Sequence, residues 1–223
     1  MTGASSGIGA ALCRRLDMRG TAVVLVGRDQ QRLSSVADSL SVESELLVAD
    51  LSTAAGRDRV CARVAATRRP IDLLINNAAI GASGWWEEIE PARNLEIIDT
   101  NVIAVQQVLD AFLGAARGHD RRPVAVVNIA SGAAEMLRPR QAVYAATKAY
   151  VLSVTQSLHD QFAAHHIHVS CVMPGFTRTG FHELAGYTAD DLPAGAAWLE
   201  PDEVASAILR AADNNEAVIR TAR

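Results

Sequence analysis

An α/β fold with a doubly wound parallel sheet (Rossmann-like) is predicted for this chain of 223 residues. Short apolar, β-branched runs alternate with longer stretches of helical periodicity, which is the pattern of βαβ units. A glycine-rich segment opens the first helical stretch, where such folds bind phosphates. Because 49% of the residues are hydrophobic and 21% are charged, the composition is that of a globular protein. We expect residues 1–223 to form a single domain.

The expected elements follow from hydrophobic periodicity and from residues that begin helices. Asp29 and either Ser52 or Thr53 stand in capping positions, and Pro91 and Pro201 stand at first helical positions. The expected helices are 7–19, 29–40, 53–68, 91–116, 141–165 and 201–213. The expected strands are 21–27, 45–49, 71–76, 124–130, 167–173 and 217–220.

Composition and charge argue against several classes of function. A net charge of −4 does not suggest a nucleic-acid or membrane-surface binder. No apolar run approaches the ~20 residues that span a bilayer. Cys13, Cys61 and Cys171 lie far apart, which favours buried free thiols in a reducing, cytoplasmic environment. The three histidines between 165 and 168 lack acids or cysteines at ligand spacing, so no metal site is predicted.

The segment Thr2-Gly3-Ala4-Ser5-Ser6-Gly7-Ile8-Gly9 stands directly before the first expected helix. Its glycines let the backbone approach a pyrophosphate, and the helix N-terminus offers free N–H groups. Taken alone, the segment is a modest signal, and a glycine-rich N-terminal tag is the lesser alternative. It resembles the Thr-Gly-x-x-x-Gly-x-Gly motif of the short-chain dehydrogenase/reductase family at every fixed position.

That resemblance implies one strand more than the sequence contains. In the family a central strand precedes the glycine loop, whereas here only Met1 precedes Thr2. Strands lie ~4.8 Å apart, so the loss of a central strand leaves a gap of about 10 Å unless the sheet closes. Our hypothesis is that the chain is truncated and that a strand of ~8 apolar residues is encoded upstream.

Tyr144 and Lys148 lie four residues apart and share a helix face. A tyrosine with a pKa of ~10 cannot readily exchange protons at neutral pH, and a nearby ammonium is expected to lower that pKa. By itself such a pair is as often a surface contact. Ser131 ends an expected strand, where ligands of these sheets bind. Asn101 sits within an expected helix, and its amide is expected to bond main chain and hold a water near Lys148.

By resemblance to the family, Asn101, Ser131, Tyr144 and Lys148 fill the four positions of a catalytic tetrad. The implied reaction is a reversible hydride transfer between a nicotinamide and a carbonyl carbon. Tyr144 gives or takes the proton, Ser131 polarises the oxygen, and Lys148 holds ribose hydroxyls. A catalytically silent dinucleotide-binding regulator or scaffold is the alternative. A sugar-nucleotide epimerase is disfavoured, because those relatives have a sizeable C-terminal substrate region that this chain lacks.

The end of the first expected strand bears on the choice of cofactor. Arg28 follows Gly27 there, and Arg32 lies one turn further on. By resemblance this favours NADP(H), while Asp29 leaves NAD(H) as the alternative. The resemblance assigns these cofactor-binding residues: Gly3, Ser5, Ser6, Gly7, Ile8, Gly9, Arg28, Asp50, Leu51, Asn77, Ala78, Tyr144, Lys148, Pro174, Gly175 and Thr177.

Several of these assignments rest on local motifs. Asp50 follows the strand at which the family holds the adenine, although it equally fits a helix cap. Asn76-Asn77-Ala78-Ala79 resembles the family's Asn-Asn-Ala-Gly, with Ala79 in place of glycine. The Pro174-Gly175 turn resembles the one that borders the nicotinamide, where the Thr177 hydroxyl is expected to bond the carboxamide or a phosphate.

Residues 176–200 have little periodicity and are expected to form the substrate loop. They contain several aromatic residues, and Trp85 and Trp86 lie in another loop that flanks the expected nicotinamide site. These aromatic residues predict an apolar alcohol or carbonyl substrate, although packing within the loops explains them equally well. In the family the helices 91–116 and 141–165 pair between subunits, which implies a homodimer or homotetramer; core burial alone also explains their apolar faces.

Overall fold

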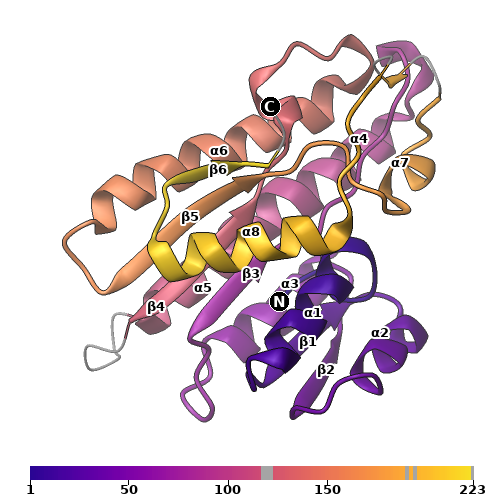
Figure 1. Cartoon of the computed structure of the whole chain (residues 1–223). Helices are drawn as coiled ribbons and strands as arrows, with labels where there is room; N and C mark the ends of the chain where they lie inside the picture. Colours follow the sequence, from indigo (N-terminus) through magenta and orange to yellow (C-terminus); the bar gives the residue numbers. More distant parts are fainter. Residues whose placement is uncertain (117–122, 189–190, 193–194, 222–223) are drawn as a thin grey trace.

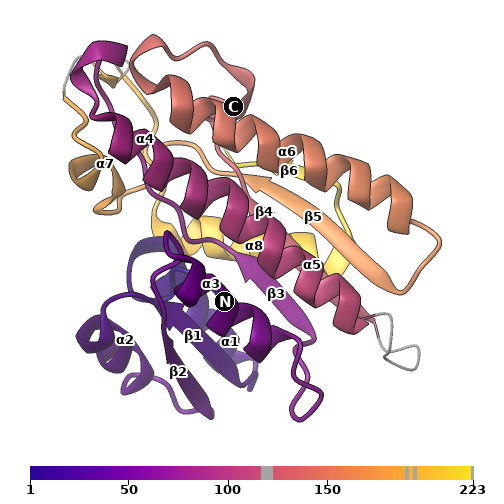
Figure 2. The same cartoon turned by 180° about the vertical axis from the view of Figure 1, so that it is seen from behind.

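Helices cover both faces of a parallel sheet in the computed structural model, which describes residues 1–116, 123–188, 191–192 and 195–221 (Figures 1 and 2). The strands are β1 (Val23–Gly27), β2 (Ser44–Val48), β3 (Leu73–Asn76), β4 (Val124–Ile129), β5 (Ile167–Met173) and β6 (Val218–Arg220). They pair in the orders β1-β2 and β3-β4-β5-β6, and every pairing is parallel. The predicted doubly wound fold is confirmed.

Met1 and Thr2 lie between β1 and β3 and join the two parts of the sheet. The Thr2 amide donates to the Ile75 carbonyl at 3.0 Å, and the Val26 amide donates to the Met1 carbonyl at 3.0 Å. The Met1 ammonium donates to the Val24 carbonyl at 2.8 Å, and burial lowers its pKa to about 6. Two residues thus stand where the family resemblance implies a whole strand, and the upstream strand stays a prediction.

The helices form two layers around the sheet. On one face lie α1 (Gly7–Met18), α2 (Gln30–Ala37) and α8 (Pro201–Asn214). On the other lie α3 (Ala54–Val64), α4 (Pro91–Ile98), α5 (Ala104–Ala116) and α6 (Ala142–Phe162), while the short α7 (Phe181–Leu184) follows β5. Successive strand residues pack against opposite layers. Leu25 belongs to the apolar cluster that includes α1 and α8, whereas Val26 belongs to the cluster that includes α3 and α5.

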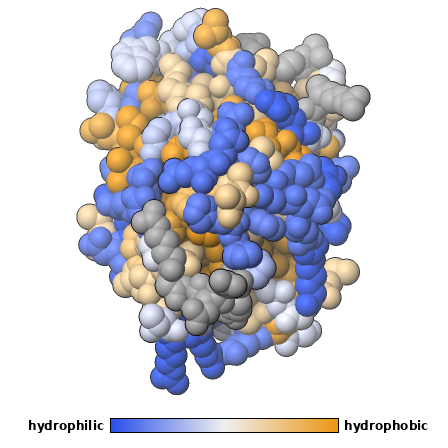
Figure 3. Space-filling view, turned by 90° about the vertical axis from the view of Figure 1, so that its left-hand side faces the viewer, coloured by the Kyte–Doolittle hydropathy of each residue, from blue (hydrophilic) through white to orange (hydrophobic). Residues whose placement is uncertain are grey.

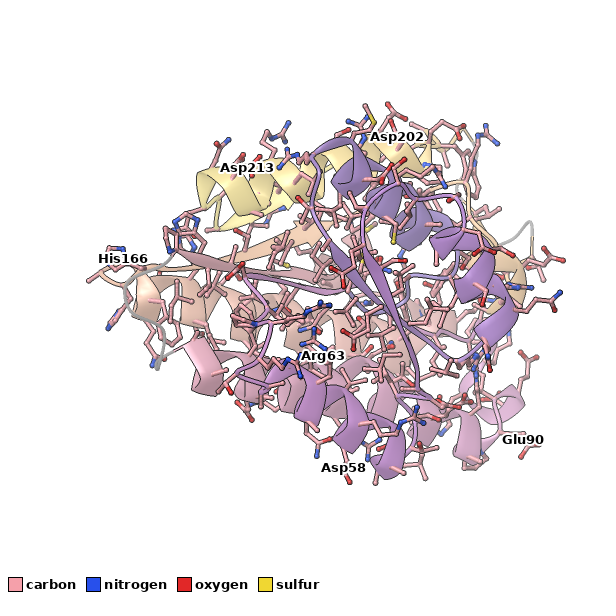
Figure 4. All side chains as sticks on the ribbon, turned by 90° about the horizontal axis from the view of Figure 1, so that it is seen from below. Asp58, Arg63, Glu90, His166, Asp202 and Asp213 are labelled. Carbon is pink, nitrogen blue, oxygen red and sulfur yellow. The ribbon has the colours of Figure 1, made fainter. Side chains whose placement is uncertain are left out.

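Ion pairs link α1 to α8 along the first layer. Arg15 pairs with Asp202, and Arg19 lies 2.9 Å from Asp213. Figure 4 shows the two aspartates toward opposite ends of α8. Because these pairs are solvent-exposed, apolar packing between the helices contributes most of the stability there.

The structure corrects one predicted element. Residues 91–116 do not form one α-helix, because a π-helical segment, Asp99–Ile103, separates α4 from α5. This segment buries Thr100 and Asn101, and such bulges occur mostly at functional sites. Helices α2, α3 and α6 also end about three or four residues before their predicted ends, whereas the predicted strands match to within two residues.

The surface at the amino-terminal ends of the strands is mainly hydrophilic, with smaller hydrophobic areas between the polar side chains (Figure 3). No helix in the described ranges is long and apolar enough to cross a membrane.

A buried polar chain links β3, β4 and α6. The Asn76 amide donates to Asn128 Oδ1 at 2.9 Å, and Asn128 Nδ2 donates to Thr155 Oγ1 at 3.0 Å. All three side chains are almost fully buried. Because unpaired polar groups are costly in such surroundings, the chain fixes α6 against β4 in one register.

Replacing Asn128 tests this connection. Asn128→Ala leaves Asn76 Nδ2 and Thr155 Oγ1 without these partners, so we expect the free energy of unfolding to fall by about 2–4 kcal/mol. Urea unfolding measures the change. Ser157→Ala, on the exposed side of α6, is the control and should cost less than about 0.5 kcal/mol. Equal losses in the two variants would contradict a structural role for the chain.

Candidate active site

A cleft of about 1400 Å³ runs along the carboxyl ends of the strands. The loops after β3, β4 and β5 meet above it, at the same end of the molecule as α7 (Figures 1 and 2). Almost all predicted site residues line it: Gly3, Ser5, Ser6, Gly7, Ile8, Arg28, Asp50, Leu51, Asn77, Ala78, Ser131, Tyr144, Lys148, Pro174, Gly175 and Thr177. Gly9 and Asn101 are not among the lining residues.

The glycine loop forms one wall of the cleft. Its backbone takes a conformation that only glycine adopts without strain. Gly3 has a φ of +68° and Gly7 a φ of +51°. A Cβ on Gly3 would lie 2.9 Å from the Ala78 backbone. Ser6 is the N-cap of α1 but makes no capping bond with its side chain, so this helix end suits an anionic ligand. Gly9 lies behind the loop, where a Cβ would collide with the Gly3 carbonyl; its contact with the cofactor stays a prediction.

The end of the cleft beside β1 carries Arg28 and Asp29, the two charged residues that bear on the choice between NADP(H) and NAD(H). Asp29 caps α2 by accepting from the Arg32 amide at 3.0 Å and also pairs with the Arg32 guanidinium. Arg28 is 59% exposed at its side chain and lies 3.9 Å from Glu96. The acid is thus engaged by its own helix, whereas Arg28 is open to the solvent.

Asp50 has a different structural role from the predicted cap. Its Oδ1 accepts from the amide and the hydroxyl of Ser52, at 2.9 and 2.8 Å. Thr53 caps α3 instead, by accepting from the Gly56 amide at 3.1 Å. The helix-cap interpretation of Asp50 is therefore wrong, and its carboxylate lines the cleft.

Ser131, Tyr144 and Lys148 come together where β4 ends. Lys148 is the only lysine of the chain, and its Nζ donates to the Ile129 carbonyl at 2.8 Å. The same Nζ lies 5.8 Å from the centre of the Tyr144 ring. Ser131 accepts from the Ala133 amide at 3.2 Å, and its hydroxyl lies close enough to the Tyr144 phenol to act on the pKa of that group. Helix α6 and the end of one strand thus gather three of the four predicted tetrad side chains.

The electrostatics of this group differ from the expectation. Burial raises the pKa of Tyr144 to about 12, and the hydrogen bond to Ser131 opposes this rise. Burial also lowers the pKa of Lys148 to about 8. The predicted lowering of the Tyr144 pKa by Lys148 is absent, because desolvation disfavours the charged form of both groups and the ammonium is directed to a carbonyl.

Asn101 supports the site from behind. Its Oδ1 accepts from the Ile80 amide at 3.0 Å, and its Nδ2 donates to the Ile80 carbonyl at 2.9 Å and to Thr147 Oγ1 at 3.1 Å. The main-chain bond expected of Asn101 is present. Both N–H groups are engaged, so the amide has no donor left for the expected water.

Thr147 is a residue that sequence reasoning missed. Its hydroxyl donates to the Tyr144 carbonyl at 2.7 Å, so it can only accept from Asn101. This fixes the orientation of the Asn101 amide and joins the π-helical segment to the helix of Tyr144 and Lys148. The available signal was its position, three residues after Tyr144 and one before Lys148.

The loop after β5 closes the cleft at the Tyr144 end. The Thr177 hydroxyl donates to the Gly175 carbonyl at 3.0 Å, so only its lone pairs remain for the ligand contact expected of it. The Phe181 ring lies 5.3 Å from the Tyr144 ring. These aromatic or apolar residues of the loop line the cleft: Phe176, Phe181, His182, Leu184 and Tyr187.

Trp85, Trp86 and Trp198 do not line the cleft, although the sequence placed them beside it. Trp85 and Trp86 are 50% and 67% exposed, and Trp198 packs against Phe176 and His182. In the part of the chain that the structure describes, no group of three or more His, Cys, Asp or Glu side chains is arranged to hold a metal ion.

A glycine loop at a helix N-terminus, beside a buried tyrosine–lysine pair at the strand ends, defines a dinucleotide-binding oxidoreductase. The family model described as short chain dehydrogenase matches residues 1–187. The chain therefore belongs to the short-chain dehydrogenase family and is an NAD(P)-dependent oxidoreductase.

Known proteins of this kind resemble the chain over nearly its whole length. An uncharacterized oxidoreductase of Staphylococcus epidermidis is 32% identical over 187 residues, covering 82% of this chain and 79% of the relative. A short-chain dehydrogenase from Sphingobium yanoikuyae in complex with NADPH superposes with a TM-score of 0.87, at 33% identity over 99% of this chain and 85% of that one. A bulky-bulky ketone specific alcohol dehydrogenase from Comamonas testosteroni gives a TM-score of 0.83, at 29% identity over 99% and 84% of the two chains.

Lys148 gives a direct test of the site's electrostatics. Because it is the only lysine, lysine-labelled protein yields one side-chain NMR signal, which we expect to titrate near pH 8. Lys148→Met removes a buried charge, so the free energy of unfolding of the ligand-free protein should rise by about 1–3 kcal/mol at pH 7.

That gain depends on pH in a defined direction. Below pH 8 the folded and unfolded chains both carry the charge, and its burial destabilises the fold. Between pH 8 and the usual pKa of 10.5 the folded protein loses the proton first, so the gain should disappear. A pH-independent gain, or a Lys148 signal titrating above pH 10, would contradict the burial of this ammonium.

Proposed function

We propose that the protein transfers a hydride between NADP(H) and an apolar alcohol or carbonyl substrate, with Tyr144 as the acid/base. The observation that carries this proposal is the contact of Ser131 with Tyr144 beside the Lys148 ammonium, within the cleft that the glycine loop borders. A nicotinamide dinucleotide supplies the hydride when it is bound.

The residues of this chain manage the proton and the substrate oxygen. The Ser131 hydroxyl and the Tyr144 phenol bind the oxygen together, which orients the substrate. With a pKa of about 12, Tyr144 is protonated at neutral pH and can donate to the developing alkoxide. Lys148 binds ribose hydroxyls of the cofactor, while Asn101 and Thr147 hold α6 in place.

Three observations support NADP(H) as the preferred cofactor. Arg28 is exposed at the end of β1, where a 2′-phosphate of the adenosine ribose would lie. Asp29, the group that would favour NAD(H), caps α2. The similar dehydrogenase from Sphingobium yanoikuyae is described in complex with NADPH.

The walls of the cleft support an apolar substrate. Phe176, Phe181 and Leu184 line its Tyr144 end, so residues 176–200 act as the substrate loop; residues 189–190 and 193–194 lie outside the described part. The similar enzyme from Comamonas testosteroni is named for bulky ketones. A cytoplasmic location stays a prediction.

A homodimer or homotetramer through α4–α5 and α6 completes the proposal. Leu95, Ile98 and Ile103 are 63%, 37% and 37% exposed, and a second subunit would cover them.

Replacing Tyr144 tests the chemistry. Tyr144→Phe removes the proton donor but keeps the ring, so turnover should fall by about 10²–10⁴-fold while NADPH affinity is unchanged. NADPH-dependent reduction of an aryl ketone panel and fluorescence titration measure the two quantities. Tyr150→Phe, which removes another hydroxyl of α6, one that donates to Gln106 of α5, is the control with wild-type turnover. NADPH binding without turnover of any ketone or alcohol by the wild-type protein would favour a silent binding protein instead.

The cofactor proposal has its own variant. Arg28→Ala should weaken NADPH binding by about 10–100-fold, because a charge-assisted contact with the phosphate is lost, and should leave NADH binding unchanged. Arg19→Ala, at the solvent-exposed end of α1, is the control for an arginine outside the cleft. Equal losses for NADH and NADPH would contradict a 2′-phosphate contact.

A further inference from the structure

Arg138 is the arginine of the cleft that lacks a carboxylate partner. Five arginines line the cleft: Arg28, Arg32, Arg93, Arg138 and Arg220. Four of them pair with carboxylates, namely Glu96 for Arg28 and Arg93, Asp29 for Arg32, and Glu135 for Arg220. Among the described residues no carboxylate lies within 4.0 Å of the Arg138 guanidinium.

The hydrogen-bonding groups of Arg138 are also poorly satisfied. Its Nε is buried and has no partner among the described residues. One terminal nitrogen contacts Met136 Sδ at 3.4 Å, and a thioether is a weak acceptor. Because Arg138 is half-buried, this arrangement is costly until an acceptor reaches the guanidinium.

The nearby carboxylates are held by other groups. Asp191 Oδ1 accepts from Arg140 Nε at 2.7 Å, and its Oδ2 accepts from the amide and hydroxyl of Thr188. Glu135 pairs with Arg220. Among the described residues neither of these carboxylates is free to pair with Arg138, so a ligand can supply the acceptor.

Arg138 belongs to the substrate end of the cleft. It lies in the loop between Ser131 and Tyr144 and lines the cleft together with both of these residues. Burial raises the pKa of the Tyr187 phenol, and the positive charge of Arg138 partly offsets this rise. Tyr187 packs against Phe181, which in turn packs against Tyr144. A ligand group at Arg138 is thus on the same side as the substrate's apolar body.

We propose that Arg138 binds a carboxylate of the substrate, so that the substrate is an alcohol or ketone with an apolar body and one acidic end. The planar guanidinium can donate two parallel hydrogen bonds to a carboxylate, which gives orientation as well as affinity. This inference rests on the proposed function. It adds an anionic group to the apolar substrate.

The test compares neutral and acidic ketones of the same skeleton. We would measure NADPH-dependent reduction of 4-oxo-4-phenylbutanoate, 5-oxo-5-phenylpentanoate and their methyl esters by the wild-type protein, Arg138→Met and Arg138→Lys. Arg210→Met is the matched control, because Arg210 lies on α8, pairs with Glu216 and does not line the cleft.

For the wild-type protein we expect kcat/KM to favour at least one acid over its ester. Arg138→Met should reduce kcat/KM for the acid by about 10–100-fold, mainly through KM, and leave the ester within about threefold. Arg138→Lys should retain part of the preference, and Arg210→Met should retain all of it.

The outcomes separate the two proposals. If no ketone is reduced at all, the proposed function fails. If the esters are reduced but the acids have no advantage, or if Arg138→Met keeps the advantage, the carboxylate site is overturned and the proposed function stands. Turnover of the esters by each variant also shows that it is folded.

Discussion

The bond between the Lys148 ammonium and the Ile129 carbonyl is the contact on which the active-site end of the molecule depends. It ties helix α6 to the last residue of β4, two residues before Ser131. An ammonium in these surroundings loses most of its hydration, and one carbonyl replaces only part of it. The site is therefore less stable without a ligand than an apolar core would be, and hydroxyl groups of a bound ribose would supply the missing acceptors.

Two threonines on α6 make this arrangement specific. Thr147 and Thr155 each donate to a carbonyl of their own helix, and each accepts from the amide of a buried asparagine, Asn101 or Asn128. Because each hydroxyl has one hydrogen, the direction of every bond is determined. One contact reaches the π-helical segment and the other reaches β4, so the position and rotation of α6 are set from two sides.

Charge along the cleft gives it two distinct ends. Arg28 stands at the end of β1, where it is open to solvent, and Arg138 stands near the substrate loop with no carboxylate partner in the described part of the chain. The Tyr144–Lys148 pair lies between the glycine loop and the aromatic wall. Such a cleft suits two ligands that meet at Tyr144, each with its own anionic group held by a separate arginine.

Local patterns were sufficient to predict most of the fold. Runs such as Val23–Gly27 and Ile167–Met173 are apolar because both faces of a parallel sheet are buried, and Pro91 and Pro201 begin helices because their fixed φ suits a first turn. The four-residue spacing of Tyr144 and Lys148 is enough to predict that both lie on one face of a helix. These features depend on neighbours within one or two turns.

Other features depended on contacts between distant segments, which periodicity does not contain. The π-helical turn at Asn101 needs Ile80 and Thr147 as partners, and the cap by Thr53 frees Asp50 for the cleft. The raised pKa of Tyr144 comes from burial that only the assembled cleft creates. The sequence alone determined the order of strands and helices and the chemistry available at their ends. The tertiary structure decided which charges are satisfied and which, like Arg138, are left for a ligand, because desolvation and pairing depend on the whole surrounding shell.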